Sequence, residues 1–73
     1  MYPTAQQYID FLTQKRCKDA LASKWGVELV LDSSGNPIYR LGSHSIVFKF
    51  RGLKSNEFRA YKFFTISQHE IVE

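Results

Sequence analysis

Cysteine is almost absent from this sequence, so the chain lacks the internal disulfides that support many small domains. The 73 residues include a single cysteine, Cys17, so no disulfide can form within the chain. The two histidines, His44 and His69, have no cysteine partners at ligand spacing, so no metal site is predicted. A domain of this size buries only about 60% of the surface of its unfolded chain. Oligomerisation is the remaining source of extra stability, and we therefore expect a homodimer.

Long apolar runs are lacking as well. No stretch approaches the roughly 20 apolar residues that a transmembrane helix needs. The first ten residues do not combine a basic start with an apolar run, as a secretory signal would. We therefore expect a cytoplasmic protein without membrane contact.

Neither sign of charge dominates. Ten Lys and Arg residues stand against seven Asp and Glu residues, which gives a net charge of +3. Such a mildly basic balance permits contact with nucleic acid or with an acidic surface, but does not require it. Aromatic residues, in contrast, are abundant at 15% of the chain. This content predicts a folded chain, and we interpret residues 1–73 as one small domain.

The first third of the chain has the pattern of an amphipathic helix. Thr4 is a favourable N-cap, and Gln7 stands where a capping box needs it. Apolar residues recur at helical spacing as far as Trp25, and Gly26 is a typical residue after a helix C-terminus. We predict a helix over about residues 4–25. The apolar stripe thins at 16–17, where the helix is expected to bend or break.

After Gly26 the apolar period changes to two, which is typical of strands. Turn-forming residues punctuate the rest of the chain, and the predicted strands cover about residues 27–31, 37–42, 45–51 and 58–65. The tail, 66–73, is weakly helical. Short connections favour antiparallel pairing between neighbours. The predicted fold is therefore α+β, with the N-terminal helix packed on a four-stranded antiparallel β-meander.

Residues 39–64 contain the motif that carries a family resemblance: YRLGSHSIVFKFRGLKSNEFRAYKFF. Leu41-Gly42-Ser43 would enter a glycine-rich loop, Val47-Phe48-Lys49 is a Val-aromatic-Lys run, and Ala60-Tyr61-Lys62 is an Ala-x-Lys element. In this order they resemble the first strands of a protein-kinase N-lobe. The resemblance covers this segment alone, without the catalytic lobe.

The resemblance implies roles for four residues. Gly42 would let the backbone approach phosphates, Val47 and Ala60 would contact an adenine, and Lys62 would hold phosphates. Only Gly42 remains of the three loop glycines, and the His-Arg-Asp and Asp-Phe-Gly motifs are absent. We therefore predict no catalytic residue, no resident cofactor and no enzyme activity. The structural alternatives are a turn glycine at Gly42 and a solvent-facing strand lysine at Lys62.

Strand parity predicts which side chains share a face. Val47 and Lys49 would share one face of their strand, and Ala60 and Lys62 would share a face of the last strand with Phe58 and Phe64. The kinase resemblance implies that these two faces lie on the same side of the sheet, where Phe58 and Phe64 would be exposed. We expect the core or a dimer interface to hold five aromatic residues of the last two strands, with base stacking as the alternative: Phe48, Phe50, Tyr61, Phe63 and Phe64. The predicted function is a non-catalytic interaction module that forms a homodimer or binds another protein. The alternatives are weak nucleic-acid binding and a vestigial nucleotide-binding fragment.

Overall fold

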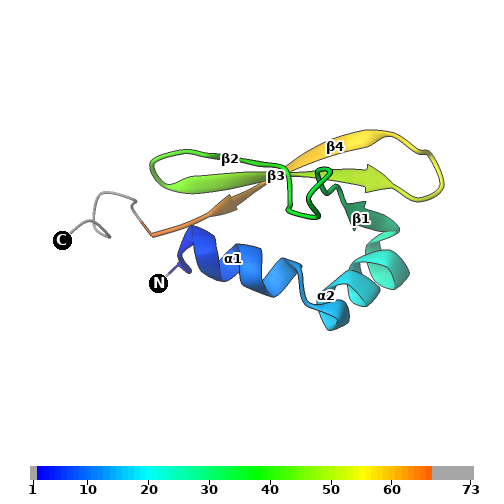
Figure 1. Cartoon of the computed structure of the whole chain (residues 1–73), viewed down its shortest axis with the longest axis horizontal. Coiled ribbons are helices and arrows are strands. Elements are labelled where there is room, and N and C mark those ends of the chain that lie inside the picture. The colour runs from blue at the N-terminus through cyan, green and yellow to red at the C-terminus, as the bar shows by residue number, and fades with distance from the viewer. Residues whose placement is uncertain (1, 67–73) are drawn as a thin grey trace.

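A computed structural model describes residues 2–66 and shows a layer of helices against one face of an antiparallel sheet (Figure 1). The predicted α+β class is confirmed. The helical layer contains α1 (Ala5–Leu12), α2 (Lys15–Ala20) and a π-helical turn (Leu21–Trp25). The sheet contains β1 (Val27–Leu29), β2 (Tyr39–Leu41), β3 (Ser45–Gly52) and β4 (Phe58–Phe64). The helical tail was predicted over 66–73, and from residue 67 onward it lies outside the described residues.

The helical segment begins and ends where the sequence predicts, but it is not one helix. The Thr4 hydroxyl accepts a hydrogen bond from the Gln7 N–H at 3.1 Å, and the Gln7 side chain accepts one from the Thr4 N–H at 2.8 Å. Gly26 ends the segment with a left-handed φ of 65°. Between these ends, the chain breaks at Thr13 and Gln14 rather than at 16–17.

The break has a local cause. The Thr13 hydroxyl donates to the Ile9 carbonyl at 2.8 Å, and such side-chain bonds compete with the helical pattern. Gln14 then takes an extended ψ of 142° and starts α2 without a side-chain cap. The single helix predicted over residues 4–25 is therefore wrong in its middle.

Within the described residues, no helix is long and apolar enough to cross a membrane.

The sheet is antiparallel throughout, but its strand order differs from a plain meander. β3 is the central strand, and β4 pairs with one side of it over Phe58–Phe64. β1 and β2 both pair with the other side of β3, one after the other along the same edge. The alternation of apolar residues identified the strands and their faces, but it carries no information about which strand lies beside which.

Residues 30–38 explain how two strands share one edge. The Val30 N–H donates to the Lys49 carbonyl at 2.9 Å, and the Lys49 N–H donates to the Ile38 carbonyl at 3.1 Å. The Ile38 N–H in turn donates to the Val30 carbonyl at 3.1 Å. The chain therefore leaves the sheet and returns to it at the same residue of β3. An isolated bridge between Leu31 and Pro37 closes the base of this excursion.

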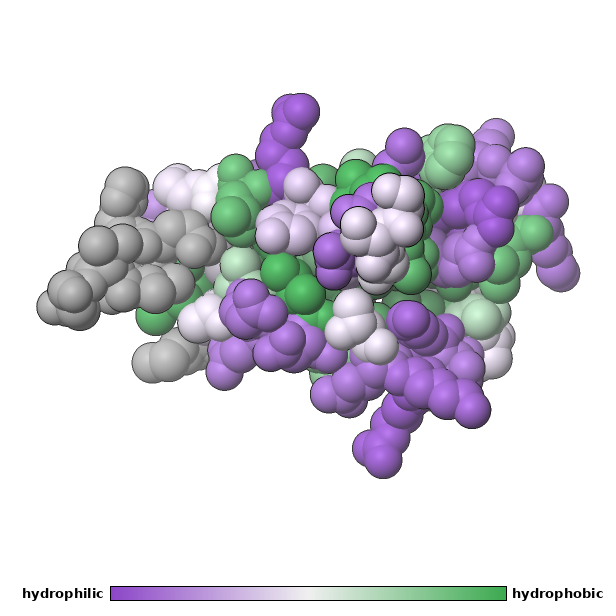
Figure 2. Space-filling model, in the orientation of Figure 1, coloured by the Kyte–Doolittle hydropathy of each residue, from purple (hydrophilic) through white to green (hydrophobic). Residues whose placement is uncertain are grey.

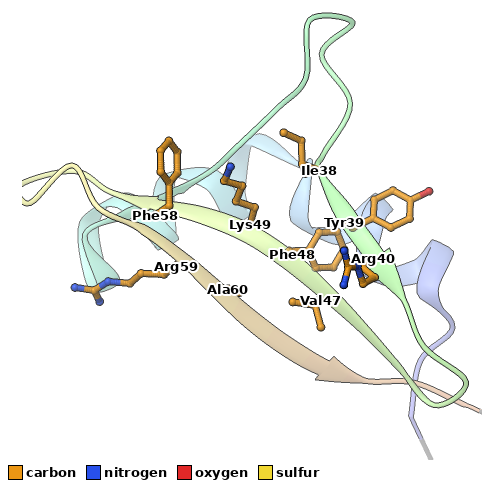
Figure 3. Close-up of a pocket in the computed structure, with 9 residues that line it drawn as sticks. All are labelled: Ile38, Tyr39, Arg40, Val47, Phe48, Lys49, Phe58, Arg59 and Ala60. Atoms are coloured by element: carbon orange, nitrogen blue, oxygen red, sulfur yellow. The ribbon is translucent and has the colours of Figure 1, made fainter.

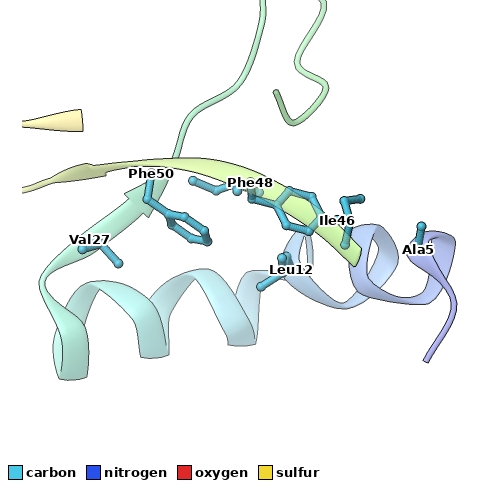
Figure 4. Packing of buried hydrophobic residues seen from close by; sticks show 7 residues of the cluster. Ala5, Leu12, Val27, Ile46, Phe48 and Phe50 are labelled. Atoms are coloured by element: carbon cyan, nitrogen blue, oxygen red, sulfur yellow. The ribbon is translucent and has the colours of Figure 1, made fainter. Parts of the chain in front are cut away.

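The core lies between the sheet and the helices. Ile46, Phe48 and Phe50 alternate along β3 and point toward the helical layer, where they meet Leu12 and Ala5 (Figure 4). All three side chains of β3 are essentially inaccessible to solvent. Burying a large apolar side chain stabilises a fold by about 1.5–3 kcal/mol, so these three supply a major part of its stability. The predicted division of β3 into two faces is confirmed.

Candidate binding surface on the open face of the sheet

The face of the sheet that points away from the helices is uncovered in the described chain, and we call it the open face. Cross-strand pairing places Val47 opposite Lys62, and Lys49 opposite Ala60. Arg40 lies opposite Val47 from the other side. Three of the four residues singled out by the sequence, Val47, Ala60 and Lys62, therefore share this face as neighbours.

A shallow hollow of about 390 Å³ lies on this face. In Figure 3, the Lys49 side chain projects between Ile38 and Phe58, and Val47 and Ala60 lie beside it along β3 and β4. Sequence reasoning placed Phe58 on this face but did not identify Ile38, or the hollow that the two residues line. They come together only through the register of β2, β3 and β4, and spacing along the chain does not reveal this register.

Gly42 and Lys62 do not line this hollow. Gly42 lies in the turn between β2 and β3, where its N–H donates to the Ser45 carbonyl at 2.8 Å. A Cβ atom at Gly42 would come within 2.9 Å of the Ser45 hydroxyl oxygen, a contact that rotation of the Ser45 side chain would relieve. Lys62 extends along the open face toward Phe64, with Nζ at 5.6 Å from the ring centre.

Basic and aromatic side chains alternate over the open face. Lys49 places its Nζ 4.3 Å from the centre of the Phe58 ring, a distance at which a cation–π attraction operates. Phe58 and Phe64 remain 62% and 53% exposed. Among the described strand residues, Glu28 is the only acidic one, and it forms an ion pair with Arg51. The face is therefore positively charged and partly apolar.

The remaining reactive side chains form no site in the described part of the chain. His44 lies in the β2–β3 turn, with its Nδ1 3.1 Å from the Ser43 hydroxyl. Cys17 packs against the core, and burial raises the pKa of its thiol, so it is a weak nucleophile at neutral pH. Among residues 2–66, no three His, Cys, Asp or Glu side chains gather closely enough to hold a metal ion.

The helical side of β4 carries a second, more apolar hollow. A groove of about 670 Å³ runs between the helical layer and β4, with Phe11, Leu21 and Trp25 on one side and Tyr61 and Phe63 on the other. Trp25 is 74% exposed. Figure 2 shows hydrophilic residues covering the outer surface of the helical layer, with hydrophobic residues reaching the surface between the two layers. On this side, Arg59 donates to the Tyr61 hydroxyl at 3.5 Å, and this contact raises the pKa of Arg59.

Comparisons with known proteins identify no relative. No protein-family model matches the chain, and neither a curated protein nor a solved structure matches it. The roles proposed below rest on the geometry of the open face and of β4.

Proposed function

We propose that this chain is a non-catalytic interaction module that acts as a homodimer and presents the open face of its sheet to a protein partner. The observation that carries the proposal is the uncovered face itself. Helices cover one side of the sheet. The other side exposes the Phe58 ring at the hollow beside Lys49, and the Phe64 ring at the far end of β4. Exposed apolar surface rimmed by polar groups is typical of interaction sites.

The charge of the open face favours an acidic partner. Arg40, Lys49 and Lys62 have no acidic neighbour among the described strand residues, because Glu28 is engaged by Arg51. Complementary charge increases the rate of association and selects the partner. A peptide that carries both carboxylates and apolar side chains would match the basic rim and the exposed rings together.

The same geometry supports a binding role rather than a catalytic one. Phosphoryl transfer needs a base and carboxylates that hold metal ions. The only carboxylate on a described strand is that of Glu28, and it is already paired. The resemblance to the first strands of a kinase N-lobe agrees with the antiparallel run β2–β3–β4, and we propose that the fragment serves as a binding surface.

Sedimentation equilibrium tests the homodimer directly. We expect a particle of twice the 8.5 kDa chain mass at micromolar concentration, with dissociation on dilution. The physical reason is that a domain of this size gains stability by burying surface against a second copy. A mass of one chain that persists up to millimolar concentration would contradict the proposal.

A vestigial nucleotide site is the second candidate, because Val47 and Ala60 line the same hollow and Lys62 lies on the same face. If it exists, magnesium-ATP should shift the backbone NMR signals of Val47, Ala60 and Lys62. The signals of Ala5 and Leu12, in the opposite layer, should stay in place. If millimolar ATP shifts none of the open-face signals, this candidate is excluded.

A single-stranded oligonucleotide in place of ATP, at low and at moderate salt, tests the nucleic-acid alternative suggested by the Lys49–Phe58 contact.

A further inference from the structure

The two edges of the sheet differ in how well they resist pairing with another strand. The edge made by β1 and β2 consists of three-residue strands separated by the excursion of residues 30–38. Short and interrupted edges disfavour intermolecular pairing. β4 is a seven-residue strand, paired with β3 at every position and without a bulge. Its outer side is therefore a regular template for another strand.

The direction of the backbone groups along β4 follows from the bonds at its two ends. The Glu57 carbonyl accepts from the Gly52 N–H at 2.8 Å, and the Thr65 N–H donates to the His44 carbonyl at 2.8 Å. Odd-numbered residues of this strand thus turn their backbone groups toward β3. Because backbone groups alternate along an antiparallel strand, the even-numbered residues turn theirs outward.

The N-terminal segment closes one end of this outer side. The Tyr8 hydroxyl donates to the Phe64 carbonyl at 2.7 Å, and the Ile66 N–H donates to the Pro3 carbonyl at 3.0 Å. The Tyr2 ring lies 5.9 Å from the ring of Phe64. Within residues 2–66, the outward backbone groups of three positions, Phe58, Ala60 and Lys62, make no hydrogen bond.

We propose that two copies of this chain pair through these positions, with β4 antiparallel to β4 of the second copy and the two-fold axis at Ala60. The inference rests on the proposed homodimer and specifies its interface. Phe58 then exchanges hydrogen bonds with Lys62 of the second copy, and Ala60 exchanges them with Ala60. Arg59 lies opposite Tyr61 between these bonded pairs.

The side chains fit this register on both faces. On the open face, the Phe58 ring meets the Lys62 ammonium of the second copy, and the small Ala60 side chains meet at the axis. On the other face, Arg59 meets the ring of Tyr61. Each basic group is therefore opposite an aromatic ring, an arrangement that stabilises cross-strand pairs.

The neighbouring symmetric registers are less favourable. Moving the axis to Arg59 places two guanidinium groups directly opposite each other, and like charges in that position are destabilising. Moving the axis to Tyr61 pairs Phe58 with Phe64, whose carbonyl already accepts from Tyr8 and whose ring packs on Tyr2. The register centred on Ala60 avoids both conflicts. It also joins the two open faces into one continuous surface.

Disulfide trapping tests the register. Opposed residues between hydrogen-bonded pairs have Cα atoms about 4.5 Å apart, within the range that a disulfide spans. In a Cys17→Ser background, Arg59→Cys chains mixed with Tyr61→Cys chains should cross-link to covalent dimers under mild oxidation. Either variant alone should cross-link at least tenfold more slowly. Fast cross-linking of Tyr61→Cys alone, or no preference for the mixture, would overturn the register.

A proline at the axis tests the edge independently. Ala60→Pro removes an outward N–H without removing a bond to β3, so we expect a folded monomer by circular dichroism and sedimentation. Ala60→Val keeps the N–H and should remain dimeric. If the wild type is itself a monomer, the homodimer and its interface both fail. If the wild type is a dimer that Ala60→Pro leaves intact, only the pairing through β4 fails. The cysteine pair decides the question should Ala60→Pro not fold.

Discussion

Replacing Phe48 with alanine is expected to unfold the domain. Phe48 is fully buried at the centre of β3 and packs edge-on against Phe63 at a ring distance of 5.6 Å. Loss of a buried phenylalanine costs about 3–5 kcal/mol. A core of this size rarely supplies more than about 3–5 kcal/mol of net stability, so the loss removes most or all of it. The cooperative thermal transition seen by circular dichroism should disappear.

Phe64→Ala is the matched control, because it removes the same side chain from the open face of the neighbouring strand. Phe64 is 53% exposed, so its truncation should change the free energy of unfolding by no more than about 1 kcal/mol. Retention of a wild-type transition by Phe48→Ala, or unfolding by Phe64→Ala, would contradict the assignment of the two faces.

Proline at Tyr61 should destabilise the fold far more than proline at the adjacent Ala60. Tyr61 lies opposite Phe48, and its backbone groups point toward β3. Removing its N–H leaves a buried carbonyl of β3 without a partner, which costs about 1–3 kcal/mol. The variant also loses the contact between the Tyr61 and Phe50 rings, which lie 5.1 Å apart. Urea denaturation, at concentrations where every variant is a single chain, measures the difference.

Tyr61→Ala separates the two contributions, because it removes the ring and keeps the N–H. Its loss of stability should fall between those of Ala60→Pro and Tyr61→Pro. Equal effects of proline at 60 and 61 would show that the backbone groups of β4 do not alternate as described.

Local signals in the sequence predicted most of the secondary structure. Thr4 with Gln7 marked the helix start, and Gly26 marked the helix end, because capping depends on a few adjacent residues. The division of β3 into buried Phe48 and open Lys49 followed from a period of two. The break at Thr13 was misplaced, because it depends on one side-chain bond back to the helix rather than on the apolar stripe.

Contacts between distant segments were beyond sequence reasoning. The predicted strand over 27–31 ends at Leu29, because Val30 and Leu31 lead into the excursion rather than along β3. Parity grouped Ala60 with Lys62 on one strand, and only the kinase resemblance implied that Val47 shares their face. The hollow beside Lys49 depends on Ile38, which returns from the far end of that excursion. The alternation of side chains is set within each strand, whereas the neighbours of a strand depend on the order of strands in the whole sheet.

The excursion of residues 30–38 also makes this chain a suitable scaffold for displaying an inserted peptide. Both of its ends are fixed at one residue, Lys49, and residues 32–36 at its tip are exposed to solvent. The cost of closing a loop grows only slowly with its length. A foreign peptide inserted between Ser33 and Ser34 would therefore extend away from the sheet with both its ends held together. An epitope or affinity sequence grafted at that point would be displayed as a loop with fixed ends, while β4 and the open face remained available for binding.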